Sequence, residues 1–319
     1  MKAKTARTEH TVTIQAPADV LRRLITRTER WPVLFEPVVY AAPNPNPGLN
    51  PGPEPELELW TRHDDRVVHW SGIHRLDAHG LRLDFRYTAV GHPATAVSGR
   101  WTLEPLDPGT TRVTLHHESR RARSVWERLF AEQLPVLRQH AELGAELDAL
   151  VFTFEDTLRS HGSAEDVHAF LYRVQGWPGA VSHVAAVTLE EPAPGVQQVT
   201  TSVRAPDGSV TAIPSVRVRL RDRVVYTPLT VPPFATAHLG EWIVATGSDG
   251  LTSVTGRHTV ALAPTRIAAA FGPGTTPADA RSRVRAALGA HSLATLDAAR
   301  AHAESRLTPA VPAASAPRG

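Results

Sequence analysis

The chain has 319 residues, no cysteine, and 34 Lys and Arg against 32 Asp and Glu. The length suits two domains of about 150 residues. The missing cysteines exclude disulfides, thiolate metal sites and a cysteine nucleophile, and favour a cytoplasmic location. A near-balanced charge and the lack of a long apolar run favour neither a nucleic-acid nor a membrane partner.

The first half is predicted to contain a strand, short helices, a strand meander and a long closing helix. An alternating strand begins near Thr11, and a helical pattern leads to Trp31-Pro32. A Pro, Asn and Gly-rich loop at 42–56 resembles a surface insertion. Pro135 predicts a kink or a break in the closing helix. The predicted strands are 36–41, 56–63, 66–76, 80–90, 97–105 and 110–118, and the predicted closing helix is 124–149.

The second half repeats this pattern. Trp177-Pro178 follows Trp31-Pro32 at an offset of 146 residues, and FATAHLGEW at 234–242 matches PATAVSGRW at 93–101 at an offset of 141. We expect a duplicated domain, and a second closing helix at 277–305. The predicted divisions are a first domain at 1–150, a second domain at 151–308 and a disordered Pro/Ala/Ser-rich tail at 309–319.

Strand, helices, meander and final helix describe an α+β domain. In such a domain a curved antiparallel sheet wraps around the long C-terminal helix and leaves a cavity between them.

The order of elements, with Trp-Pro after the first helices, resembles the helix-grip fold of START and pollen-allergen-type proteins. The tandem arrangement over about 8–308 is similar to the di-domain aromatase/cyclases of bacterial aromatic (type II) polyketide biosynthesis. The strand SVRVRL at 215–220 carries Ser-x-Arg, which resembles the pocket Ser and Arg of that family. The segment AHSLATLDAARAHAE at 290–304 resembles its closing helix, where the family commonly has Asn at the place of His291.

The resemblance implies an enzyme of antibiotic biosynthesis. A poly-β-ketone on an acyl carrier protein would close its first ring by an aldol reaction between the seventh and twelfth carbons, then lose water. No metal and no cofactor is implied. The implied partners are the acyl carrier protein and other subunits of the synthase, with the protein itself a monomer or weak homodimer. The alternative is a non-catalytic START-like protein that binds lipids or other hydrophobic ligands.

Matching strands of the two copies differ in their polar residues. The segments VVHWSGIHRL and VTAIPSVRVRL align Trp70 with Ile213, Gly72 with Ser215, and His74 with Arg217. Alternation places Ser215 and Arg217 on one strand face. Because Arg stays charged and has a planar fork of donors, it suits oxyanion binding better than His. We therefore predict that the second copy is catalytic and that the first orients the chain. The alternative for Arg217 is a surface position, since Arg219 and Arg221 share its parity.

The other predicted site residues come from both copies. Tyr226 aligns with Phe85, and His258 with His117; a phenol and an imidazole suit proton transfer. A solvated Tyr tip and a surface His are the alternatives, and Trp31 and Trp177 also suit a structural role. The predicted catalytic residues are Arg217, Ser215, Tyr226, His258 and His291. The predicted substrate contacts are Trp31, Trp70, His74, Phe85, Tyr87 and Trp177.

Three further observations concern other kinds of site. His116, His117 and Glu118 do not predict a metal site, because adjacent strand residues point to opposite faces. Hydrolase, metalloprotease, nucleotide and dehydrogenase motifs are missing from the sequence. Arg120, Arg121 and Arg123 are the densest candidate patch for an acidic carrier protein.

Overall fold

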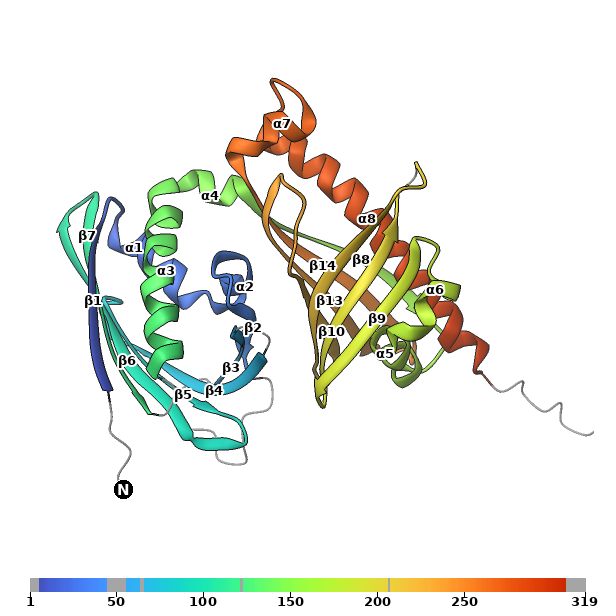
Figure 1. The fold of residues 1–319 in the computed structure, drawn as a ribbon, viewed down its shortest axis with the longest axis horizontal. Coiled ribbons are helices and arrows are strands. Elements are labelled where there is room, and N and C mark those ends of the chain that lie inside the picture. Colours follow the sequence, from blue (N-terminus) through green and yellow to red (C-terminus); the bar gives the residue numbers. More distant parts are fainter. Residues whose placement is uncertain (1–5, 45–55, 64–65, 121–122, 206, 308–319) are drawn as a thin grey trace, which may run out of the picture. The chain divides into compact units, whose positions relative to one another are not determined.

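The computed structural model describes residues 6–44, 56–63, 66–120, 123–205 and 207–307. It contains two seven-stranded sheets, each accompanied by its own helices (Figure 1). The strand order is β1-β7-β6-β5-β4-β3-β2 in the first sheet and β8-β14-β13-β12-β11-β10-β9 in the second. The two orders correspond strand for strand, so the predicted duplication and the predicted α+β helix-grip class are confirmed.

The first half of the chain forms the first sheet. Its elements are β1 (Ala6–Ile14), α1 (Ala18–Thr26), η1 (Thr28–Arg30), α2 (Trp31–Leu34), β2 (Val38–Pro43), β3 (Glu56–His63), β4 (Arg66–Leu76), β5 (Arg82–Ala89), β6 (His92–Asp107), β7 (Thr110–Arg120), α3 (Arg123–Leu143) and α4 (Ala145–Leu150).

The second half follows the same order. Its elements are β8 (Val151–Ser160), α5 (Ala164–Tyr172), η2 (Val174–Gly176), α6 (Trp177–Ala180), β9 (Val184–Ala193), β10 (Val196–Arg204), β11 (Val210–Arg219), β12 (Arg223–Pro228), β13 (Ala235–Thr246), β14 (Thr252–Leu262), η3 (Pro264–Arg266), α7 (Ile267–Phe271) and α8 (Pro277–Ser305).

The predicted strands of the first half agree with β2 to β7 to within a few residues. The predicted domain boundary at 150/151 falls between α4 and β8, and it stays a prediction. Most of the predicted loop insertion, 45–55, and the predicted tail at 309–319 lie outside the described residues.

The repeated Trp-Pro dipeptide has the same structural role in both halves. Each Trp begins a four-residue helix, α2 or α6, with Pro in its first turn, where a missing N–H costs nothing. The indole N–H of Trp31 donates to the carbonyl of Leu24, and that of Trp177 donates to the carbonyl of Phe170, both at 3.1 Å. Each Trp therefore fixes its short helix to the end of the preceding one.

The closing helix of the first half differs from the prediction. A split at Pro135 was one predicted outcome, and it is wrong, because α3 continues through Pro135. Buried Leu134 and Leu137 beside the proline hold both parts of the helix against the core. The helix ends instead before Gly144, whose φ of 55° lies outside the helical region. In the second half α8 spans its predicted range without a break.

The core of the first half is aromatic. Trp70 of β4 meets Trp126 of α3 edge to face, with ring centroids 4.9 Å apart. Phe85 and Tyr87 of β5 pack against the same helix through Phe130 and Trp126. The curved sheet and α3 are thus joined by rings that leave little free volume between them.

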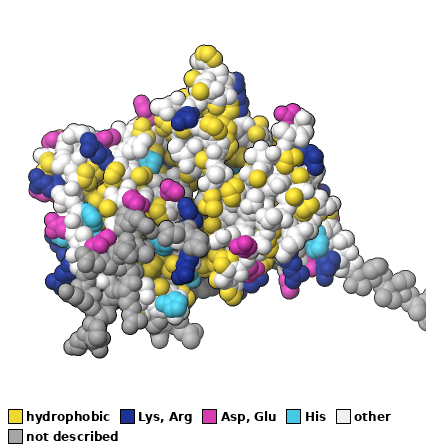
Figure 2. All heavy atoms as spheres, viewed as in Figure 1, with side chains coloured by type: hydrophobic (Ala, Val, Ile, Leu, Met, Phe, Trp, Pro, Cys, Tyr) yellow, Lys and Arg dark blue, Asp and Glu magenta, His cyan; other side chains and the backbone are white. Residues whose placement is uncertain are grey.

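Charges are dispersed over the face seen in Figure 2, where Lys and Arg side chains are scattered among acidic ones. No helix in the described ranges is long and apolar enough to span a membrane.

Candidate active site

A small apolar cavity lies between the first sheet and α3. Its volume is about 60 Å³, far less than a long polyketide chain occupies. The sheet contributes Val38, Leu59, Thr61, Phe85, Tyr87 and Trp101, the N-terminal helices and the residue that follows them contribute Ile25, Trp31 and Phe35, and α3 contributes Trp126, Leu129, Phe130, Gln133 and Leu137.

A phenol and an imidazole form a close pair at this cavity. Tyr87 Oη lies 2.5 Å from His74 Nε2, and Tyr87 itself lines the cavity. Burial lowers the pKa of His74 to about 4 and raises that of Tyr87 above its usual range. The pair is therefore neutral near pH 7.

Gly72 makes room for this pair. It stands opposite Tyr87 in the β4–β5 register. A Cβ at Gly72 would lie 2.2 Å from Tyr87 Cδ1 and 2.8 Å from the carbonyl oxygen of Arg86. The Tyr87 ring therefore fills the space beside Gly72. In the second half Pro228 aligns with Tyr87, at the same offset that aligns Tyr226 with Phe85.

The other predicted substrate contacts of the first half divide into two groups. Trp31 and Phe85 line the cavity, and the Trp31 ring lies 5.6 Å from that of His74. Trp70 is 1% exposed, donates to Thr61 Oγ1 at 2.8 Å, and is not among the cavity-lining residues. The geometry gives Trp70 the position of a core residue.

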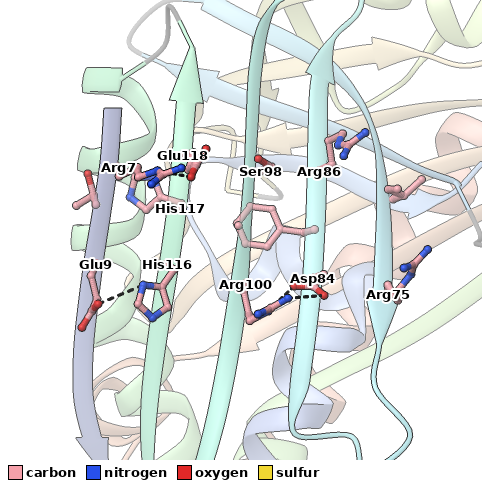
Figure 3. Close-up of a pocket in the computed structure, with 14 residues that line it drawn as sticks. Arg7, Glu9, Arg75, Asp84, Arg86, Ser98, Arg100, His116, His117 and Glu118 are labelled. Carbon is pink, nitrogen blue, oxygen red and sulfur yellow. Dashed lines mark hydrogen bonds and ion pairs between the residues drawn. The ribbon is translucent and has the colours of Figure 1, made fainter. Parts of the chain in front are cut away.

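A second hollow, of about 850 Å³, lies on the opposite face of the same sheet (Figure 3). Asp84 and Arg86 alternate along β5 with the inward rings, so they point away from α3. Arg100 makes two hydrogen bonds to Asp84 at 2.6 and 3.1 Å, and His116 pairs with Glu9 at 3.2 Å. Because this hollow is charged and open, it excludes water less well than the inner cavity does.

Arg217 of the second half is buried, only 3% exposed, as its predicted inward position requires. Its guanidinium donates to the carbonyl oxygens of Leu171 and Tyr172 at the end of α5 and to Gln197 Oε1 at 2.9 Å. The cation also lies over the Trp177 ring, 5.3 Å from its centroid. A cation at a helix C-terminus compensates the helix dipole, so the geometry favours a role in holding α5.

Ser215 lies on the same strand as Arg217 and is also buried. Its hydroxyl donates to the carbonyl of Val199 on the neighbouring strand at 3.2 Å. Both residues of the predicted Ser-x-Arg pair therefore donate hydrogen bonds to backbone carbonyl oxygens. Trp177 is buried beside Arg217, where it serves the Trp-Pro role described above.

His258 is 2% exposed and packed among rings. It stacks on Phe154 at 5.0 Å and meets Trp242 edge to face at 5.9 Å. Burial, followed by the nearby Arg285 cation, lowers the pKa of His258 to about 4. Arg285 itself makes a two-pronged ion pair with Asp156.

The remaining predicted catalytic residues lie in separate environments. His291 of α8 stacks on His183, with centroids 4.4 Å apart and planes 11° apart, and burial lowers its pKa. Tyr226 is half-buried and meets His238 edge to face at 5.8 Å. Their predicted roles stay predictions.

Sequence reasoning missed the contribution of α3. Trp126, Phe130 and Gln133 line the cavity, and their spacing of three and four residues is the helical signal that could have identified them. The sequence analysis predicted Tyr87 and His74 as separate substrate contacts and did not predict that they contact each other. Of the predicted carrier patch, Arg121 lies outside the described residues, and so do the side chains of Arg120 and Arg123. Among the described side chains, no group of three or more His, Asp or Glu is placed to hold a metal ion.

Known proteins resemble this chain over nearly its whole length. A family model described as polyketide cyclase/dehydrase and lipid transport matches residues 5–155. The granaticin polyketide synthase bifunctional cyclase/dehydratase of Streptomyces violaceoruber is 34% identical over 302 residues, covering 91% of this chain and 92% of the relative. The actinorhodin counterpart of Streptomyces coelicolor is 35% identical over 309 residues, 91% of this chain and 94% of the relative.

A solved structure agrees. The di-domain ARO/CYC StfQ from the steffimycin biosynthetic pathway is 32% identical, with a TM-score of 0.85 over 94% of this chain and 99% of that one. Two helix-grip halves and an apolar cavity define a START-like protein. The curated relatives show which family of START-like proteins this chain belongs to. The chain belongs to the family of polyketide synthase bifunctional cyclase/dehydratases. It is thus an enzyme of the cyclase/dehydratase class, and the alternative of a non-catalytic carrier is set aside.

Proposed function

We propose that the protein closes the first ring of a carrier-bound poly-β-ketone, joining its seventh and twelfth carbons, and then removes water. The acyl carrier protein and other subunits of a type II synthase are its proposed partners. A cytoplasmic location is part of the proposal and rests on the absence of cysteine.

The observation that carries the proposal is the neutral Tyr87–His74 pair at an apolar cavity. In an aldol closure, an enolate carbon attacks a ketone carbon, the ketone oxygen becomes an oxyanion, and this oxygen takes up a proton. The neutral His74 imidazole can take the proton whose loss forms the enolate, and the Tyr87 phenol can donate a proton to the oxyanion. The protonated imidazole can then return its proton to the phenolate. Water leaves when the new hydroxyl departs with a proton lost from the adjacent carbon.

The apolar wall supports the same chemistry in two ways. It excludes water, so hydrogen bonds to a developing oxyanion are stronger than they are in solvent. It also confines a long flexible chain, which reduces the entropy cost of bringing two distant carbons together.

Arg217 is the competing candidate for oxyanion stabilisation, in the second half. Its permanent charge favours it, but its guanidinium donates hydrogen bonds to the end of α5 and to Gln197. We therefore propose that Tyr87 and His74 act on the substrate and that Arg217 holds α5.

Product profiling in a reconstituted synthase tests this assignment. Tyr87→Phe should lower formation of the aromatised ring by about 10²-fold, the usual effect of losing one oxyanion donor. Arg217→Lys, which keeps the charge, should retain most activity. Tyr172→Phe is the matched control, because its hydroxyl donates to Glu191 at 2.6 Å. Full activity in Tyr87→Phe, with loss in Arg217→Lys and an intact fold by circular dichroism, would place the chemistry in the second half.

A further inference from the structure

Two buried polar atoms of α3 have no hydrogen-bond partner among the described residues. They are the indole Nε1 of Trp126 and the amide Oε1 of Gln133. Both side chains line the apolar cavity of the first half. Trp126 is only 1% exposed. A donor and an acceptor therefore stand in a water-poor space with nothing to bond.

Such atoms are costly, because water satisfies them in the unfolded chain and nothing does in the folded one. Two other buried or half-buried indoles of the same half do have a hydrogen-bond acceptor. The N–H of Trp31 has the carbonyl of Leu24, and the N–H of Trp70 has Thr61 Oγ1. An unpaired indole and an unpaired amide oxygen on one cavity wall indicate a ligand that supplies both partners.

We propose that Trp126 and Gln133 are recognition residues for two enolised β-diketone segments of the bound chain. The Trp126 N–H donates to a ketone oxygen of one segment, and Gln133 Oε1 accepts from an enol hydroxyl of the other. An enolised poly-β-ketone presents carbonyl acceptors and hydroxyl donors along its length, whereas a hydrocarbon tail presents neither. This assignment rests on the proposed function, since it names the residues that bind that substrate.

The spacing of Trp126 and Gln133 along α3 sets the distance between the two substrate oxygens that they bind. They are seven residues apart, which is two turns on one helix face, or roughly 10 Å along the axis. The two residues therefore contact different oxygens of an extended chain. Tyr87 stacks on Trp126 with centroids 5.7 Å apart and planes 10° apart, so an oxygen held by Trp126 lies near the phenol.

The small size of the cavity means that it must enlarge when the substrate binds. At about 60 Å³ it cannot hold a polyketide unless the rings on its wall move apart. Binding should therefore change the surroundings of the Trp126 ring, and this gives a direct readout in the full-length protein.

Titration with 1-phenylbutane-1,3-dione, an enolised β-diketone, tests the inference, with butylbenzene as the oxygen-free comparison. In spectra of protein labelled with ¹⁵N at tryptophan, the Trp126 indole N–H should shift with the diketone more than with butylbenzene. Trp126→Phe identifies the signal and should weaken diketone binding about tenfold, with little effect on butylbenzene. Gln133→Met, which keeps the length and removes the acceptor, should weaken binding of the longer 1,7-diphenylheptane-1,3,5,7-tetraone, whose outer oxygens can reach both residues. Trp60→Phe is the control, because that indole N–H also has no partner among the described residues but does not line the cavity; it should leave the affinity for both ketones unchanged.

Equal loss of both ligands in Trp126→Phe, or an indole signal that the diketone does not move, would overturn the inference. If Trp126→Phe fails to fold, the wild-type indole signals and the Gln133→Met titration decide alone. The result is independent of turnover. Normal diketone recognition with no ring closure in the reconstituted synthase would count against the proposed function and leave this inference standing.

Discussion

Single residues explain why two copies of one domain differ inside. Gly72 and Ser215 occupy equivalent places, yet only Gly72 stands beside a tyrosine ring. Likewise His74 contacts a phenol, whereas Arg217 contacts the end of a helix. The duplication therefore kept the fold and changed the chemistry that each interior offers.

Adding one methyl group at Gly72 should disable the first half. Gly72→Ala would push Tyr87 away from His74 and cost about 1–3 kcal/mol of stability through overpacking. Ring formation in the reconstituted synthase should fall to the level of Tyr87→Phe. Gly179→Ala is the control, since nothing lies within 4 Å of the added Cβ. Unchanged product from Gly72→Ala would argue against the Tyr87 role.

Removing the Arg217 charge should mainly affect folding. Arg217→Met leaves the Leu171 and Tyr172 carbonyls and the Gln197 amide without their donor, so we expect a loss of about 3 kcal/mol in the free energy of unfolding. Urea denaturation measures this. A variant as stable as the wild type would show that α5 does not depend on the cation, which would return Arg217 to the list of candidate catalytic residues.

At the scale of elements, each closing helix packs against its own sheet. Trp126 of α3 meets Trp70 of β4, and Ser292 of α8 lies against Gly256 of β14. The helix α3 supplies five of the fourteen residues that line the cavity, although it carries a proline in its interior. Pro135 is exposed, so its cost is confined to one missing backbone hydrogen bond and the strain that its ring imposes.

Restoring the missing donor should stabilise this helix. Pro135→Ala is expected to raise the free energy of unfolding by roughly 1–3 kcal/mol, because proline is about 3 kcal/mol worse than alanine inside a helix. Thermal unfolding followed by circular dichroism checks the direction. A lower midpoint would mean that the bend at Pro135 is needed for packing against the sheet.

For the whole molecule, buried neutral histidines in both halves make stability depend on pH. Burial lowers the pKa of His74 and of His258 to about 4, against about 6.5 in the unfolded chain. Between these values the unfolded state binds more protons, so stability is full above about pH 6.5 and is lost as pH falls toward 4.

Acidification to pH 5 should therefore cost about 2 kcal/mol for each of these two histidines. The urea midpoint at pH 5.0 should lie well below that at pH 7.5. The double variant His74→Gln, His258→Gln should show a smaller difference between the two midpoints. An equal pH dependence in wild type and double variant would assign the effect to other groups.

Delivery of the substrate is also a property of the whole protein. An acidic carrier protein should associate by charge attraction, which salt weakens. Charge reversal at Arg120, Arg121 and Arg123 should raise the KM for carrier-bound substrate and reduce its dependence on salt, with kcat changed less. Kinetics at two ionic strengths would show this, and an unchanged salt dependence would direct the search to another surface.

The sequence by itself determined the duplication, the order of elements and most strand positions, because alternation and helical spacing are local properties of the chain. It also placed Ser215 and Arg217 on one strand face and predicted the family. Only the tertiary structure decided what each side chain contacts. The partners of Arg217 lie 45 and 46 residues earlier in the chain, and those of His74 and Trp126 come from other strands. Such contacts depend on how sheet and helix pack, and the same packing reduces the interior of the first half to a cavity of about 60 Å³.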